Sequence, residues 1–169
     1  VDEEGHRQVL AIEPILEESK EAYSQLFRSL QERGLKTPSL IVSDAHSGLV
    51  SAIRHSFPGS AWQRCKVHFM RNILAHVPHK EKSIFAAKLK QIWLAPDRET
   101  AHQMTDHLVE QYETRFPKAI QTLLDRLEDS LQFFAFPTLD ARKIASTNML
   151  ERLNKEIRRR TRVVGIFPN

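Results

Sequence analysis

The chain contains a single cysteine, Cys65, among its 169 residues, so a disulfide within the chain is excluded. Such sparse cysteine usage suits a reducing compartment. The sequence also lacks any apolar run near the roughly 18 residues that cross a bilayer, and no secretory or transit pattern opens it. Internal repeats and low-complexity tracts are missing as well. We therefore predict a globular, cytoplasmic protein with no membrane partner.

The composition is that of a folded domain, with 41% hydrophobic and 27% charged residues. The formal net charge is only +4, but the string "ERLNKEIRRRTR" places six cations within twelve residues. Such a cluster favours contact with a polyanion, although a solvated helix face or a basic tail gives the same pattern. Both interpretations stay open at this point.

The first 65 residues alternate between patterns typical of strands and of helices. We predict a turn at residues 2–5 leading into a strand at residues 7–13, and a further strand at residues 40–43. The string "SAWQRC" at residues 60–65 predicts a third strand. Amphipathic helices are expected at residues 19–33 and 49–57, each followed by a glycine or proline signal. This alternation predicts an α/β fold.

After Cys65 the pattern becomes helical. We predict helices at residues 66–75, 80–94, 98–115 and 117–131, separated by prolines, and a last helix at residues 149–162 after a loop. An all-α block of roughly eighty residues is thus inserted between an α/β portion and a final helix. The predicted boundaries are residues 1–64, 65–143 and 144–169.

Asp44 directly follows the apolar strand pattern of residues 40–43. Open α/β sheets bind ligands beyond the carboxyl ends of their strands, which makes Asp44 a candidate ligand residue. An aspartate in this place can equally cap the helix that follows. One residue does not decide between these interpretations.

Glu151 is the second candidate acid. On a helix it shares one narrow arc with Lys155, Arg158 and Arg162. The opposite face carries an apolar stripe that we expect to dock on the sheet: Met149, Leu150, Leu153, Ile157 and Val164. One carboxylate in a row of cations suits a metal ligand beside phosphates. The alternative is a capping box, in which Asn148 is the N-cap and Glu151 the third helical residue.

Asp44 and Glu151 together can supply two of the carboxylates that hold Mg²⁺. They lie 107 positions apart and meet only if the helical block leaves and returns to the same sheet edge. Two-metal phosphoryl chemistry usually needs a third carboxylate, and this chain shows no convincing one.

A second cluster raises the question of zinc. Cys65, His68, Asn72, His76 and His79 recur at helical spacing. Pro78 disfavours one continuous helix through them, so a polar seam against the sheet is the alternative. The phenylalanines of "FFAF" could stack on bases, or could pack in the core.

Three separated strings, "LIVSDAHSGLVSAI", "FPGSAWQRCKVHFMRN" and "STNMLERLNKEIRRRTRVVGIFPN", resemble the bacterial Mutator-type insertion-sequence transposases. The resemblance covers nearly the whole chain. It implies a DDE enzyme, in which a ribonuclease H-like core carries three acids and an all-α domain is inserted before the third. Asp44 matches the second acid, Glu151 the third, and Cys65 with His68 the family's Cys-x2-His motif near the core.

The resemblance also implies partners and cofactors. A complete enzyme would hold two Mg²⁺ or Mn²⁺ ions, bind double-stranded DNA at element ends and target, act as a homo-oligomer and associate with the nucleoid. The family's first acid lies on a strand before residue 1, so we expect a partial core and a central fragment that does not cleave DNA by itself. The expected DNA contacts are Arg64, Arg71, Lys155, Arg158, Arg159, Arg160 and Arg162.

We therefore predict a transposase catalytic-domain fragment for metal-dependent DNA strand cleavage and strand transfer. Two alternatives differ in class. One is a non-catalytic DNA-binding remnant of a transposase, favoured by the missing first acid. The other is a zinc-stabilised structural module centred on Cys65 and His68.

Overall fold

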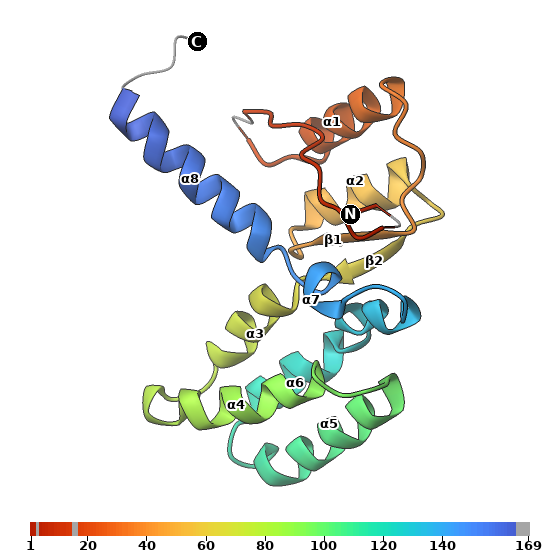
Figure 1. Cartoon of the computed structure of the whole chain (residues 1–169). Coiled ribbons are helices and arrows are strands. Elements are labelled where there is room, and N and C mark those ends of the chain that lie inside the picture. The colour runs from red at the N-terminus through yellow and green to blue at the C-terminus, as the bar shows by residue number, and fades with distance from the viewer. Residues whose placement is uncertain (3, 15–16, 165–169) are drawn as a thin grey trace.

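A small α/β part and a larger helical part meet where the sheet ends (Figure 1). The computed structural model describes residues 1–2, 4–14 and 17–164. Strands β1 (Leu40–Ser43) and β2 (Ala61–Arg64) pair in parallel, and α2 (Ser47–Ser56) connects them, as parallel strands require a crossover. The predicted strands at residues 40–43 and 60–65 are therefore confirmed. The fold is mostly helical, with a small parallel sheet compatible with the α/β class.

Helix α1 (Lys20–Glu32) begins and ends at the predicted signals. The Ser19 hydroxyl accepts a hydrogen bond from the Ala22 N–H (3.2 Å), and Gly34 after the helix has a φ of +97°, a conformation that glycine adopts without strain. The helix packs along α2, where the rings of Phe27 and Phe57 meet edge to face at 5.3 Å. Both helices lie on the same side of the sheet (Figure 1).

The N-terminal segment departs from the prediction. The turn forms, because the Gly5 N–H donates to the Asp2 carbonyl (3.0 Å) and Gly5 has a φ of +81°. The strand predicted at residues 7–13 is wrong: within the described residues this stretch pairs with no strand. Val9 and Ile12 are 61% exposed. Strand propensity without a partner for the backbone N–H and C=O groups does not make a strand.

The helical block extends from the end of the sheet to α8. It consists of α3 (Lys66–Leu74), α4 (Lys82–Ile92), α5 (Arg98–Tyr112), α6 (Pro117–Arg126) and α7 (Ala141–Ile144), with 3₁₀ turns at His79–Glu81, Glu128–Ser130 and Gln132–Ala135. The predicted helices are confirmed, but α4, α5 and α6 are shorter than predicted. The helix predicted to residue 131 stops at Arg126, and the predicted loop after it contains 3₁₀ turns and α7.

The main hydrophobic core lies inside this block. Phe85 meets Tyr112 and Phe116 edge to face, at ring distances of 5.0 and 5.6 Å. Phe133 is buried, and Phe134 packs partly buried against the same core. The phenylalanines of "FFAF" are therefore core residues, which rejects base stacking for Phe133.

Gln63 of β2 joins the sheet to the helical block. Its side chain is fully buried; the amide donates to the Ser130 carbonyl (2.8 Å) and accepts from the Phe133 N–H (2.9 Å). The Ser130 hydroxyl in turn accepts from the Trp93 indole N–H (2.9 Å). Buried polar groups need such partners, so this network fixes where the block sits on β2.

Helix α8 (Asn148–Val164) projects away from the rest of the molecule (Figure 1). Leu153 is half-buried, but Met149 and Leu150 are 45% and 56% exposed. The expected docking of this stripe on the sheet is therefore wrong for the first turn, whose apolar side chains line a pocket instead. The Val164 side chain lies outside the described residues. Throughout the described part of the chain, every helix is too short or too polar to serve as a transmembrane span.

We expect Gln63→Ala to lower the free energy of unfolding by about 2–6 kcal/mol, since two buried backbone groups would lose their partner at roughly 1–3 kcal/mol each. Gln132→Ala is the matched control, because that amide donates to the Glu128 carbonyl at the surface. We expect the control to cost about 0.5 kcal/mol. Equal losses in urea unfolding would contradict the linking role of Gln63.

Candidate active site and basic face

Three segments converge where the sheet ends. The Cys65 N–H donates to the Ser43 carbonyl (2.7 Å), which carries the strand pairing one residue further. The Lys66 N–H donates to the Ala145 carbonyl (3.1 Å). The helical block thus leaves the sheet at Cys65 and returns beside it at Ala145.

Asp44 lies half-buried just beyond β1. Its Oδ1 atom accepts a hydrogen bond from the His46 N–H (3.2 Å), which forms a local turn before α2. His46, and not Asp44, occupies the N-cap position of α2, so the helix-capping alternative is wrong. Burial first, and then the charges of Glu18 and Asp44, raise the pKa of Tyr23.

Glu151 lies in the first turn of α8 and faces α3. Its Oε2 atom is 3.3 Å from Arg71 Nη2, and its Oε1 atom is 3.4 Å from His68 Nε2. Oε1 is buried and accepts no hydrogen bond within the described residues. The predicted capping box is wrong, because Asn148 is already helical and Thr147 precedes the helix. Glu151 is thus available for a role other than capping.

The Cys-x2-His motif connects α3 to the start of α8. The Cys65 sulfur is fully buried and accepts hydrogen bonds from the Thr147 N–H (3.4 Å) and hydroxyl (3.3 Å). His68 faces Glu151, whereas His76 and His79 are exposed. Among the residues that the structure describes, no three His, Cys, Asp or Glu side chains gather as a metal site would require. Cys65 is therefore a hydrogen-bond acceptor next to the core.

Thr147 was not singled out from the sequence. The string "STN" before the last helix suggested a cap, and a cap is a local interaction. The partner of Thr147 lies 82 positions earlier in the chain. Only the return of the helical block to the sheet brings the two together.

The two arginines predicted near this site differ in exposure. Arg64 is half-buried, its guanidinium lies 4.5 Å from the centre of the Phe69 ring, and burial lowers its pKa. Asn72, in the amide orientation that satisfies both its polar atoms, accepts from Arg64 (3.1 Å). Arg71 is 59% exposed beside Glu151. Arg71 is thus better placed than Arg64 to reach a ligand from solvent.

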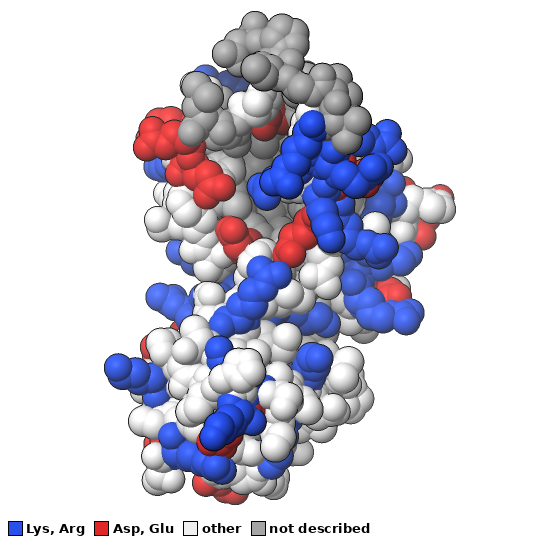
Figure 2. All heavy atoms as spheres, turned by 90° about the vertical axis from the view of Figure 1, so that its left-hand side faces the viewer, with Lys and Arg blue, Asp and Glu red and all other residues white. Residues whose placement is uncertain are grey.

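A basic face covers α8 in the space-filling view (Figure 2). Glu156 pairs with Arg159 (2.7 Å) and Arg160 (2.9 Å), and hydrogen bonds from first Arg159 and then Arg160 lower the pKa of Glu156 to about 2. The exposed side chains of Lys155, Arg158 and Arg162 form no ion pair within the described residues. These last three cations are the ones best placed to meet an external anion.

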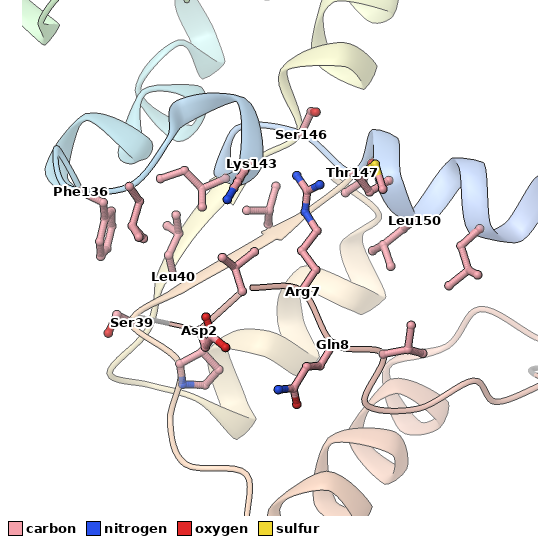
Figure 3. Close-up of a pocket in the computed structure, with 18 of the residues that line it drawn as sticks. Asp2, Arg7, Gln8, Ser39, Leu40, Phe136, Lys143, Ser146, Thr147 and Leu150 are labelled. Carbon is pink, nitrogen blue, oxygen red and sulfur yellow. The ribbon is translucent and has the colours of Figure 1, made fainter. Parts of the chain in front are cut away.

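A pocket of about 680 Å³ lies along β1 (Figure 3). Leu40 of β1, Leu150 of α8 and Phe136 contribute apolar walls, while Arg7 and Lys143 add charge. Lys143 also donates to the Gly5 carbonyl (2.9 Å), which ties the N-terminal turn to α7. Of the two strands, β1 contributes Leu40 and Val42 to the lining and β2 contributes no residue.

Acids beside the end of a parallel sheet, next to a row of cations, are typical of proteins that act on nucleic-acid phosphates. The whole chain, residues 1–169, matches the family described as "Transposase, Mutator family". The chain therefore belongs to the Mutator family of transposases, and the resemblance read from the sequence is confirmed.

Relatives with similar sequences are also transposases. The chain is 41% identical to the transposase for insertion sequence element ISRM5 of Rhizobium meliloti, over 100% of this chain and 42% of the relative. It is 39% identical to the transposase for IS256 in transposon Tn4001 of Staphylococcus aureus, over 100% of this chain and 44% of the relative. The chain thus spans less than half the length of these relatives.

The contact between Cys65 and Thr147 makes a prediction about metal removal. We expect a chelator to leave the unfolding temperature of the purified chain unchanged, because the sulfur already accepts two hydrogen bonds from Thr147. Thermal unfolding with and without EDTA, together with metal analysis, checks this. One equivalent of zinc whose removal unfolds the chain would support the zinc module instead.

Proposed function

We propose that this chain is the central part of a DDE transposase catalytic domain, which in the complete protein cuts double-stranded DNA at element ends and joins the freed 3′-hydroxyl to a target. One observation carries the proposal. The helical block returns to the sheet end that bears Asp44, and it brings the helix that bears Glu151. Both acids thus belong to segments that meet at Cys65.

Asp44 and Glu151 would hold Mg²⁺ or Mn²⁺. Carboxylate oxygens are the ligands that these ions prefer, and the buried Glu151 Oε1 atom has no hydrogen-bond donor, which fits a cation ligand. Two bound ions would supply the activation of water or of a 3′-hydroxyl and the neutralisation of phosphate charge. The approach of the two carboxylates stays a prediction of the proposal.

The basic face would bind the DNA backbone. Lys155, Arg158 and Arg162 follow Glu151 along one arc of α8, so phosphates contacted there continue toward the acids. Arg159 and Arg160 share Glu156, which reduces their effective charge. Arg71 would contribute beside Glu151, and Arg64 from a more buried position.

The ribonuclease H-like core that the family resemblance implies would be completed at β1. Of the two strands, β1 alone lines the pocket in Figure 3, whose walls include Leu40 and Leu150. A further strand fits the edge of β1 away from β2, because it would pair with the backbone of β1 and cover apolar side chains. We propose that the strand with the family's first acid lies there in the complete protein.

A second candidate function is DNA binding without chemistry. The observation that favours it is the charge distribution: the basic face is present in this chain, whereas the acid that would match the family's first is not recognised in its sequence. For the 169-residue chain alone, we expect binding and no cleavage. The two candidates therefore differ in what the complete protein does.

We expect the chain to bind DNA with a strong salt dependence and little sequence preference. Arg158→Gln with Arg162→Gln should lower the slope of log affinity against log salt by about two, since each lost phosphate contact removes about one. The measurement is a fluorescence-anisotropy titration at several salt concentrations.

The matched control is Arg159→Gln with Arg160→Gln, which removes the same formal charge. We expect a change in slope of about one or less, because Glu156 already pairs with both arginines. If both pairs of substitutions change the slope equally, net charge rather than the arc of Arg158 and Arg162 governs binding.

In the complete transposase, Glu151→Gln should abolish cleavage of element ends while sparing DNA affinity. The amide keeps the shape of the side chain but loses the charge that ligates a metal. Rates of strand cleavage in Mg²⁺ and in Mn²⁺, measured beside DNA affinity, test this. Cleavage at a near wild-type rate would remove Glu151 from the active site and would leave DNA binding as the supported function.

A further inference from the structure

The start of α8 is fastened to α3 at two successive levels. At the first level the Cys65 sulfur accepts both the backbone N–H and the hydroxyl of Thr147. One helical turn further, His68 and Arg71 contact the two oxygens of Glu151, at 3.4 and 3.3 Å. We call these five residues the α8 anchor.

We infer that the α8 anchor is a positioning device for Glu151, and that Cys65, His68 and Arg71 are its positioning residues. This inference rests on the proposed function, because it assigns the Cys-x2-His motif a part in the same site. Cys65 fixes the backbone from which α8 starts. His68 and Arg71 then fix the direction of the carboxylate.

The contacts with His68 and Arg71 are compatible with Glu151 also binding a metal ion. A carboxylate has about four lone-pair sites, so contacts with His68 and Arg71 leave sites open for a cation. Carboxylates that hold metals are commonly oriented by neighbouring groups. Here Arg71 donates a hydrogen bond to Oε2, while His68 Nε2 approaches Oε1 to 3.4 Å without a hydrogen bond, so Oε1 keeps its lone pairs. A glutamate side chain without such contacts samples several rotamers, which would lower the fraction of molecules ready for chemistry.

A contribution to folding stability does not by itself explain the contacts of His68 and Arg71 with Glu151. The side chains of Arg71, Glu151 and His68 are 59%, 38% and 31% exposed, and ion pairs with this exposure contribute little to folding. Their alignment on Glu151 therefore points to orientation. Cys65, in contrast, is fully buried and contributes to packing as well.

The sole cysteine offers a readout that does not depend on activity. Cys65 lies under the start of α8, so its reaction with a thiol reagent such as DTNB reports how often the anchor opens. We expect His68→Ala and Glu151→Ala each to accelerate the reaction of the 169-residue chain roughly five- to twenty-fold. The exposed His76→Ala is the matched control and should leave the rate unchanged.

A double-mutant cycle separates the anchor from general destabilisation. If His68 and Glu151 act through one contact, the double variant should react no faster than the faster single variant. Independent effects would multiply, and that result would overturn the inference. Circular dichroism at the same temperature establishes that each variant is folded. If His68→Ala does not fold, His68→Gln takes its place in the cycle.

Cleavage by the complete transposase tests orientation at atomic level. The amide nitrogen of glutamine reaches the place of His68 Nε2, which contacts Glu151, whereas that of asparagine reaches the place of Nδ1. We expect His68→Asn to lower kcat at least ten-fold with KM for DNA unchanged, and His68→Gln to restore most of the rate. Equal rates for the two variants would overturn the inference.

These measurements distinguish the anchor from the proposed function. If Glu151→Gln still cleaves, the proposed function fails, and the thiol cycle still reports whether the contacts hold α8. If Glu151→Gln is inactive but His68→Asn cleaves at the wild-type rate, only the positioning role is overturned.

Discussion

The backbone around Cys65 is the constraint on which the rest of the structure depends. One N–H group pairs with Ser43 at the end of β1, and the next pairs with Ala145 at the end of the helical block. From Lys66 to Ala145 the chain makes an excursion of about eighty residues. Closing this loop costs conformational entropy, but that cost grows only slowly with loop length. Because the excursion closes at its starting point, segments that carry Asp44 and Glu151 reach one end of the sheet.

The helical block closes this loop because it is itself a packed unit. Its aromatic core around Phe85 and Tyr112 stabilises the fold between Cys65 and Ala145, so the two ends are held at a defined separation. Gln63 orients the helical block relative to the sheet, since its buried amide keeps both hydrogen bonds only when Ser130 and Phe133 lie over β2. Apolar packing thus supplies the stability, and one polar side chain selects the orientation.

Local signals were sufficient for most elements. Ser19 and Pro117 mark helix starts and Gly34 a helix end, and each acts through its own backbone or near neighbours. The end of β1 at Asp44 followed in the same way from the apolar pattern. Long-range partners could not be predicted. Residues 7–13 have strand composition but no neighbouring strand in the described chain. Asn148 was expected to cap the last helix but lies within it, and Thr147, just before the helix, bonds to Cys65 82 positions earlier.

Helix α8 connects the two halves of the proposed site mechanically. It has 17 residues, hence a length of about 25 Å. Thr147, just before it, bonds to Cys65, and Glu151 in its first turn contacts His68 of α3. Glu156 pairs with arginines three and four positions later, so the distal part of the helix is stabilised from within. In the proposed site, the contacts at the base of α8 would thus influence both the direction of the Glu151 carboxylate and the position of the cations that follow it along the helix.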